Sequence, residues 1–274
     1  MNQTDNFILT KEYKRFVEFC KACHREKFIG LCYGPPGVGK TESAMKFSKW
    51  KEILVDIEGV SSSYDYETHI SYDDLNTVLF TPDVSSTVNK FESKLRESIF
   101  NFNEAKERFI YGKNETPVKL KQYVETIIID EADRLNAKGF EEIRDLYDRK
   151  FRKSPQDPQL TVILIGMPGI EKRLARFPQL YSRIGFVHSF KSLSNEEVIF
   201  IIKNQIKLLN VNIDINNFSD NEAISALTRI TNGNFRLINR LLKQCIRIMD
   251  VNHLSSISKE VVEAARECLV IGNF

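Results

Sequence analysis

The stretch Gly34-Pro-Pro-Gly-Val-Gly-Lys-Thr41 places three glycines before a lysine and a hydroxyl residue, in the pattern G-x4-G-K-[ST]. It follows an apolar segment, residues 28–33, and opens a helical pattern at Thr41. Such glycines let backbone N–H groups turn toward an anion, and the start of the helix adds positive potential. This favours a phosphate site over a Gly/Pro turn with an incidental Lys-Thr: Lys40 would contact the β- and γ-phosphates of ATP, and the Thr41 hydroxyl a magnesium ion. The residues expected to bind the nucleotide are Gly34, Pro35, Pro36, Gly37, Val38, Gly39, Lys40, Thr41 and Glu42.

Two adjacent carboxylates follow an apolar run in Thr126-Ile-Ile-Ile-Asp-Glu-Ala-Asp133. A strand that ends in Asp-Glu delivers one carboxylate toward a magnesium ion and a second toward the water that attacks the phosphate. Asp130 is expected to be a magnesium ligand together with Thr41, and Glu131 a catalytic residue together with Lys40. Helix capping is the alternative for both acids, and for Asp133 it is the favoured interpretation.

The bulk composition is that of an ordinary globular chain of 274 residues, 42% hydrophobic and 28% charged, with a net charge of +2. The length accommodates one large domain, or one medium and one small. The small net charge excludes a global field for nucleic acid, so any such surface must be local. No apolar run approaches the roughly 20 residues of a membrane span, the N-terminus lacks a signal peptide's order, and the cysteine usage fits a reducing compartment. We therefore expect a cytoplasmic protein with no membrane contact.

Cys20-Lys-Ala-Cys23-His24 matches the pattern for covalent haem attachment or half of a zinc site. Haem attachment of this type requires export, which the N-terminus does not support. A zinc site needs a second ligand pair, and only Cys32 is close in sequence. The cysteines also belong to an apolar stripe at helical spacing, which favours a buried helix. The stripe consists of Tyr13, Phe16, Val17, Cys20 and Cys23.

Apolar runs and helical periodicities alternate up to about residue 190, which predicts an α/β fold with a parallel sheet covered by helices on both faces. Strand candidates are residues 28–33, 51–57, 77–80, 124–129, 161–165 and 186–190, and helix candidates are 10–26, 41–50, 88–109, a segment around 140–147, and 169–176. Residues 56–76 hold six acids and no Lys or Arg, so we expect an exposed loop there that is unsuited to DNA. Residues 111–122 and 151–159 are further expected loops.

Helix-start signals replace strand signals after about residue 192. Residues 194–197 and 219–222 both fit the capping box, in which a serine hydroxyl accepts a backbone N–H and a glutamate reaches back. Asn234 and Ser258 are expected to cap two further helices, which end near residues 249 and 270. These signals predict a small all-helical second domain.

The segments GPPGVGKT and IIIDEAD, followed by a later strand and a helical domain, resemble the AAA+ ATPases. More narrowly, DEADRL, LIGMPGIEKRLARFPQLYSRIGFVHSF and TNGNFRLINRLL resemble the TniB/MuB-type (TnsC-like) transposition ATPases. The resemblance runs from about residue 10 to the C-terminus. It implies a P-loop AAA+ ATPase domain with an N-terminal helix at residues 1–192, followed by a helical lid domain at residues 193–274.

The resemblance also implies roles for individual side chains. Arg183 matches an arginine that projects into the neighbouring subunit's nucleotide, with Arg176 as the second candidate, and a surface arginine paired with an acid as the alternative. Arg236 matches the sensor-2 arginine, which touches the nucleotide from the helical domain. Met167 occupies a position that is commonly a polar Asn or Thr, and a thioether cannot donate a hydrogen bond to the attacking water. We therefore expect slow hydrolysis, suited to a timer more than to a motor.

A basic stripe is expected on the helix that Asn234 caps. Its members, which lie within about 60° of one another on a helical projection, are Arg236, Arg240, Lys243 and Arg247. A solvated face and a contact with DNA or another partner are both compatible with this pattern.

The resemblance implies an ATP-assembled homo-oligomer, a ring or helical filament, that binds the backbone of double-stranded DNA without sequence preference and recruits an integrase-type transposase. Candidate nucleic-acid contacts, each cluster alternatively a solvated patch, are Lys113, Lys119 and Lys121, and Arg149, Lys150, Arg152 and Lys153. The expected function is an ATP-dependent regulator of DNA transposition whose disassembly is controlled by hydrolysis. A helicase or clamp-loader type of AAA+ ATPase, and a nucleotide-gated signalling switch with little hydrolysis, are the rival interpretations.

Overall fold

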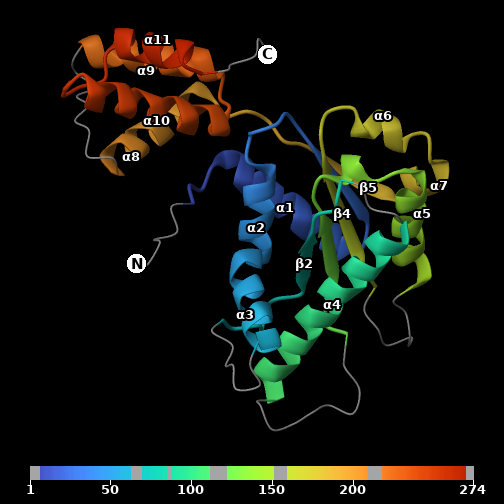
Figure 1. Ribbon diagram of the computed structural model, residues 1–274. Helices are drawn as coiled ribbons and strands as arrows, with labels where there is room; N and C mark the ends of the chain where they lie inside the picture. The colour runs from blue at the N-terminus through green and yellow to red at the C-terminus, as the bar shows by residue number, and fades with distance from the viewer. Residues whose placement is uncertain are drawn as a thin grey trace. The chain divides into compact units, whose positions relative to one another are not determined.

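The computed structural model describes residues 7–62, 70–84, 88–111, 122–150, 159–208 and 218–269. The chain forms two compact units, coloured along the chain in Figure 1. The larger, which we call the sheet unit, comprises Arg15–Gly34 and Lys40–Phe190. The smaller, which we call the helical unit, comprises Met1–Lys14, Pro35–Gly39 and Lys191–Phe274.

A five-stranded parallel sheet forms the centre of the sheet unit. Its strands are β1 (Ile29–Tyr33), β2 (Thr77–Phe80), β3 (Thr126–Ile129), β4 (Thr161–Gly166) and β5 (Ile184–Ser189), in the order β2-β3-β4-β1-β5. Every residue of β2, β3 and β4 is buried, as expected for parallel strands covered on both faces. The predicted α/β class with a parallel sheet is confirmed.

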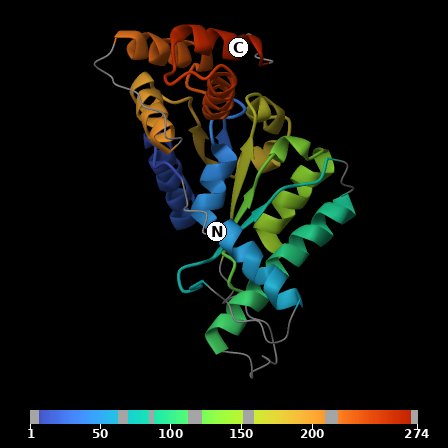
Figure 2. The same ribbon diagram turned by 60° about the vertical axis from the view of Figure 1, so that its left-hand side comes forward.

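Helices flank this sheet, with α1 and α2 on one side and α4 and α5 on the other in both views (Figures 1 and 2). Their bounds are α1 (Lys11–Glu26), α2 (Lys40–Ser48), α3 (Trp50–Ser62), α4 (Val88–Tyr111), α5 (Ala137–Asp145), α6 (Ile170–Leu174) and α7 (Pro178–Tyr181). A short 3-10 turn, η1 (Ala132–Arg134), and a π-helical turn, η2 (Leu146–Lys150), lie before and after α5. No helix within the described residues is both long and apolar enough to cross a bilayer.

The strand predicted at residues 51–57 is wrong, because this segment lies in helix α3. Trp50, Ile53 and Asp56 are buried at a spacing of three, whereas Leu54 and Val55 are 40% and 57% exposed. A short apolar run satisfies both a strand and a helix, and only its packing decides between them.

The exposed loop predicted at residues 56–76 is also wrong in its first part, whereas residues 70–76 form no helix or strand and expose Ser71, Asp73 and Asp74, as predicted. Residues 56–62 continue α3, and further on Tyr72 and Leu75 are buried. Residues 63–69 of this segment lie outside the described ranges.

Four helices build the core of the helical unit: α8 (Asn195–Leu208), α9 (Phe218–Thr231), α10 (Phe235–Val251) and α11 (Lys259–Glu267). The first capping box is confirmed, since Ser194 N donates to Glu197 Oε2 at 3.0 Å and Glu197 N to Ser194 Oγ at 3.3 Å. The caps predicted at Asn234 and Ser258 are confirmed as well. The second capping box was predicted to begin with Ser219 as the N-cap residue. This prediction is wrong, because α9 begins at Phe218 and Ser219 therefore lies inside its first turn.

The cysteine cluster at the end of α1 belongs to the core, as the apolar stripe predicts. Cys20 and Cys23 are fully buried, and burial raises the pKa of both thiols, that of Cys23 to about 12. His24 Nδ1 lies 2.9 Å from Thr126 Oγ1, and burial, reinforced by the charge of Lys27, lowers the pKa of this imidazole. Among the described residues, no three His, Cys, Asp or Glu side chains gather in a way that would hold a metal.

Burial predicts which thiols react. At about pH 7.5, iodoacetamide should modify Cys268, which is exposed, and leave the buried Cys20, Cys23, Cys32 and Cys245 intact, because attack requires an accessible thiolate. Peptide mass spectrometry of the native protein reads this out, with urea-unfolded protein as the control in which all five react. Native labelling of Cys23 as fast as Cys268 would contradict this packing.

Candidate nucleotide site

The loop between β1 and α2, residues 34–39, which we call the glycine loop, has the backbone conformation that its glycines predict. Gly37 and Gly39 adopt φ values of +79° and +107°, in the left-handed region that favours glycine. At Gly34 the reason is close approach, because a Cβ there would lie 2.3 Å from the carbonyl oxygen of Phe190. Since α2 begins at Lys40, the positive end of a helix dipole stands at the end of this loop.

Lys40, Thr41 and Asp130 come together at the carboxyl end of the sheet. The hydroxyl of Thr41 donates to Asp130 Oδ2 at 2.7 Å, although the two residues are 89 positions apart. Lys40 Nζ donates to the carbonyl of Gly34 at 2.6 Å and lies 3.9 Å from Met167 Sδ. Asp130 is 3% exposed, and its Oδ1 accepts the Glu131 N–H at 2.9 Å.

This arrangement fits a magnesium nucleotide. The hydroxyl of Thr41 and the carboxylate of Asp130 are hard oxygen ligands of the type that Mg²⁺ takes from proteins alongside phosphate oxygens. A Cβ at Gly39 would meet nothing within 4 Å, so the loop leaves open space beside its backbone. Bound magnesium would offset phosphate charge, while Lys40 would add a compact cation.

Glu131 sits at a strained turn. Its φ and ψ of 51° and 42° are left-handed, which is uncommon for a residue with a side chain and recurs at functional sites. Its carboxylate forms an ion pair with Arg134 and remains about half exposed. Arg134 in turn donates to the carbonyl of Pro82 at 2.9 Å, so the carboxylate is oriented by an anchored guanidinium.

Asp133 does not cap the following helix, which corrects the favoured interpretation of this residue. The cap of α5 is Asn136, whose side chain accepts the Gly139 N–H at 2.9 Å. Asp133 Oδ2 instead accepts the Met167 N–H at 2.7 Å and so ties the end of β3 to the end of β4. Gly166 makes room for this contact, since a Cβ there would lie 2.9 Å from Asp133 Oδ2.

Arg173 is a structural residue of the site that sequence reasoning missed. Its guanidinium donates to the carbonyls of Asp133, at 2.6 Å, and Leu135, and lies over the ring of Phe140 at 5.1 Å from the centroid. It thereby fixes α6 against η1. Arg173 lies within the segment LIGMPGIEKRLARFPQLYSRIGFVHSF, and no spacing in that segment indicates these contacts.

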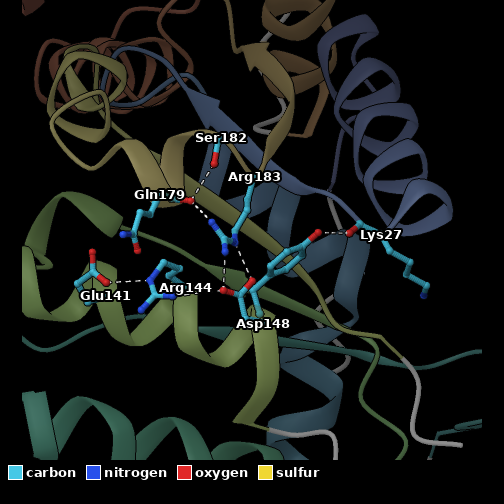
Figure 3. A network of polar contacts seen from close by, with 8 residues as sticks. Lys27, Glu141, Arg144, Asp148, Gln179, Ser182 and Arg183 are labelled. Atoms are coloured by element: carbon cyan, nitrogen blue, oxygen red, sulfur yellow. Dashed lines mark hydrogen bonds and ion pairs between the residues drawn. The ribbon is translucent and has the colours of Figure 1, made fainter. Parts of the chain in front are cut away.

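Arg183 is engaged within its own chain (Figure 3). Its Nε and Nη2 contact the two carboxylate oxygens of Asp148, each at 2.7 Å, and its Nη1 donates to the carbonyl of Gln179. Arg144 also contacts Asp148, at 3.3 Å. The pairing with an acid, left open from the sequence, is therefore present in the protomer. Arg176 is exposed, and no ion pair involving it occurs among the described residues.

Arg236 lies in the first turn of α10, in the helical unit, with an exposed side chain. Its backbone N–H donates to the carbonyl of Gly37 at 3.0 Å. The neighbouring cap residue Asn234 donates its Nδ2 to the carbonyl of Pro36 at 2.8 Å. The start of α10 therefore holds the glycine loop by two hydrogen bonds.

Some of the remaining predicted site residues lie within the described residues, and others lie outside them. Val38 is buried in the loop, and Glu42 on α2 is paired with Lys51 at 2.9 Å. The DNA-contact candidates Lys113, Lys119, Lys121, Arg152 and Lys153 lie outside the described residues, and Arg149 and Lys150 lie at the end of η2 with side chains that are likewise outside them.

The bidentate pair of Arg183 and Asp148 predicts a stability effect. Asp148→Asn should lower the free energy of unfolding by about 1–2 kcal/mol, because a partly buried guanidinium loses charge-assisted hydrogen bonds. Thermal melting followed by circular dichroism measures this. Glu97→Gln is the matched control, because it removes an exposed carboxylate on α4 that forms no ion pair with any of the described residues. Equal melting temperatures for the two variants would contradict the energetic role of the pair.

Comparisons with known proteins agree with this geometry. A family model described as an AAA domain matches residues 23–174. A Staphylococcus aureus protein named "Potential ATP-binding protein" is 39% identical over 289 residues, covering 99% of both chains. Two solved structures with a TM-score of 0.61 share the fold: the Thermotoga maritima RuvB Holliday junction branch migration motor (19% identity, 98% of this chain and 72% of that one) and the Aeropyrum pernix ORC2 protein in its ADP form (12%, 96% and 71%). With its glycine loop and its Thr41–Asp130 pair, the chain thus belongs to the AAA+ family of P-loop ATPases.

Proposed function

We propose that this protein hydrolyses ATP with Mg²⁺ in a homo-oligomer that assembles on double-stranded DNA, and that it regulates DNA transposition by recruiting an integrase-type transposase. The observation that carries the hydrolytic part is the meeting of Thr41 and Asp130 at 2.7 Å, with Glu131 as the next residue. In this proposal residues 1–192 act as the ATPase domain and residues 193–274 as its lid. The transposition part rests on the resemblance of the three segments named above.

Each side chain of the site has a distinct task in hydrolysis. Lys40 exchanges the Gly34 carbonyl for the β- and γ-phosphate oxygens of ATP. Thr41 and Asp130 would hold the magnesium ion, the Thr41 hydroxyl through an oxygen lone pair, which is compatible with its donating its proton to Asp130. Glu131 orients the attacking water and accepts its proton, while Arg134 fixes the direction of that carboxylate.

Arg183 links hydrolysis to assembly. To reach a neighbouring copy's γ-phosphate, it must first leave both oxygens of Asp148. The Asp148 carboxylate of the same chain and the γ-phosphate bound to a neighbouring copy therefore compete for the Arg183 guanidinium. Because a lone protomer has no neighbour to offer that phosphate or to receive that arginine, it is a poor enzyme. Arg176, which is exposed, is the second candidate for this role.

Met167 limits the rate in this scheme. Its thioether lies 3.9 Å from Lys40 Nζ, at the place where a polar side chain would hold the attacking water. A slow reaction sets the lifetime of an assembly on DNA, which suits a regulator more than a motor. The RuvB structure is that of a Holliday junction branch migration motor, and its likeness to this chain is one of fold alone.

Two substitutions test the chemistry in opposite directions. Glu131→Gln should lower turnover at least about 100-fold with little change in ATP affinity, because it removes the base and keeps the shape. Met167→Asn should raise the turnover of assembled protein, because an amide donates a hydrogen bond to water. Phosphate release and fluorescent-nucleotide binding measure both. Unchanged turnover in either variant would contradict the assigned role of that residue.

The biological role is tested by electron microscopy with ATP, with and without duplex DNA, alongside a strand-transfer assay with an integrase-type transposase. Filaments or rings on DNA, and strand transfer that requires them, are expected. A closed ring that unwinds DNA would favour a helicase or clamp-loader type instead. Nucleotide binding without DNA-stimulated turnover would favour a signalling switch.

A further inference from the structure

Helix α10, labelled in Figure 1, carries a row of exposed cations that the nucleotide site does not use beyond its first member. We call Arg236, Arg240, Lys243 and Arg247 the α10 stripe; all four are exposed, and no ion pair is recorded for any of them among the described residues. At a rise of 1.5 Å per residue, the stripe runs along about 16 Å of the helix. The sequence left open whether these residues form a solvated face or a contact surface.

Within the described residues, three arginines on other helices are neutralised by an acid of the same helix. On α4, Arg96 pairs with Glu92 at 2.8 Å and Arg108 with Glu104 at 3.2 Å, each four residues apart. Along α5, Arg144 pairs with Glu141 at 2.8 Å. An unpaired row of cations is therefore not how this chain ordinarily covers a helix.

The α10 stripe repels itself. Its members follow at intervals of four, three and four residues, so like charges occupy each neighbouring position, at a cost of roughly 0.2–0.5 kcal/mol for each pair. The first turn of α10 holds Arg236 and no acid, which also opposes the helix dipole. Asp250, at the C-terminal end, is the one carboxylate within the helix.

Packing keeps the stripe on the surface. The opposite face of α10 is buried in the helical core through a larger set of side chains, namely Leu237, Ile238, Leu241, Leu242, Cys245 and Met249. The helix cannot rotate its cations inward without exposing these residues. An external anion would relieve the repulsion that the fold leaves in place.

The chemistry of this face favours a nucleic-acid backbone over a protein partner. The one large apolar side chain of α10 that is well exposed is Val251, its last residue. Protein interfaces rely on apolar and aromatic side chains at their centre, whereas a sugar–phosphate backbone is bound through cations and hydrogen-bond donors and needs no apolar centre. Measured along the duplex axis, one DNA strand carries a charge about every 3.4 Å, so the stripe is as long as an axial segment that holds about five phosphates of that strand.

We propose that the α10 stripe binds the phosphate backbone of double-stranded DNA without reading bases. This locates the DNA surface of the proposed function, on which it rests. Because Arg236 N holds the Gly37 carbonyl, the same helix contacts the glycine loop at one end and DNA along its length. Nucleotide binding at the loop and DNA binding on α10 would thereby act on the same helix.

The test removes three charges and leaves Arg236, the member next to the glycine loop, in place. The stripe variant is Arg240→Gln, Lys243→Gln and Arg247→Gln together. The control variant is Lys191→Gln, Lys259→Gln and Arg266→Gln, which removes the same charge from the same unit away from α10. Fluorescence anisotropy of a labelled duplex with ATP is measured over a salt series, together with melting temperature and fluorescent-nucleotide affinity.

Wild type and the control variant should bind with equal slopes of log affinity against log salt. The stripe variant should bind at least about tenfold more weakly at 0.1 M salt, with a slope smaller by roughly 2–3 for each protomer, at unchanged nucleotide affinity and melting temperature. A stripe variant that binds like wild type overturns this proposal and leaves the proposed function standing. If polyglutamate displaces the labelled DNA as effectively as unlabelled duplex does, the stripe binds acidic proteins instead, and this proposal is overturned too. A wild type that binds no duplex overturns the proposed function itself.

Discussion

The hydrogen bond from Thr41 to Asp130 is the contact on which the rest of the site depends. Thr41 lies in the first turn of α2, which follows β1 and its loop, and Asp130 directly follows β3; in the sheet, β4 lies between β1 and β3. The two residues meet because parallel strands bring their carboxyl ends to one edge, where open α/β sheets place their ligands. The register that pairs Tyr33 with Gly166 and Ile129 with Leu164 sets this meeting point. A one-residue slip of β3 would turn its carboxylate to the other face.

Around this bond, arginines with backbone or carboxylate partners hold the elements of the candidate site in place. Arg173 anchors the turn after β3, Arg134 directs Glu131, and Arg183 is kept at Asp148. Arg173 and Arg134 fix the geometry of the site. Arg183, in contrast, is bound to Asp148 through the guanidinium that the proposed mechanism needs at a neighbouring copy's phosphate. In the helical unit, Asn234 and the start of α10 make the corresponding contacts to the glycine loop. In the proposed mechanism, assembly would therefore change activity without moving Thr41 or Asp130.

Local patterns predicted the parts of the fold that local physics decides. The loop glycines at positive φ, the caps at Ser194, Asn234 and Ser258, and the apolar strands all follow from short-range rules. Prediction failed at residues 51–57, where an apolar run fits two periodicities and tertiary packing selects the helix. It also missed partners distant in sequence, such as Asp133 with Met167 and Arg183 with Asp148, because no spacing rule encodes them. The roles assigned to Arg183 and Arg236 by resemblance stay predictions.

The most direct test of the account is the magnesium dependence of nucleotide affinity when the Thr41 hydroxyl is removed. Isothermal titration calorimetry with a non-hydrolysable ATP analogue would compare wild type and Thr41→Val, each with Mg²⁺ and with EDTA. We predict that Mg²⁺ tightens binding at least about tenfold in wild type and has almost no effect in the variant, while affinities in EDTA are alike. A variant that keeps the full magnesium effect would show that the Thr41–Asp130 oxygen pair is not the metal site.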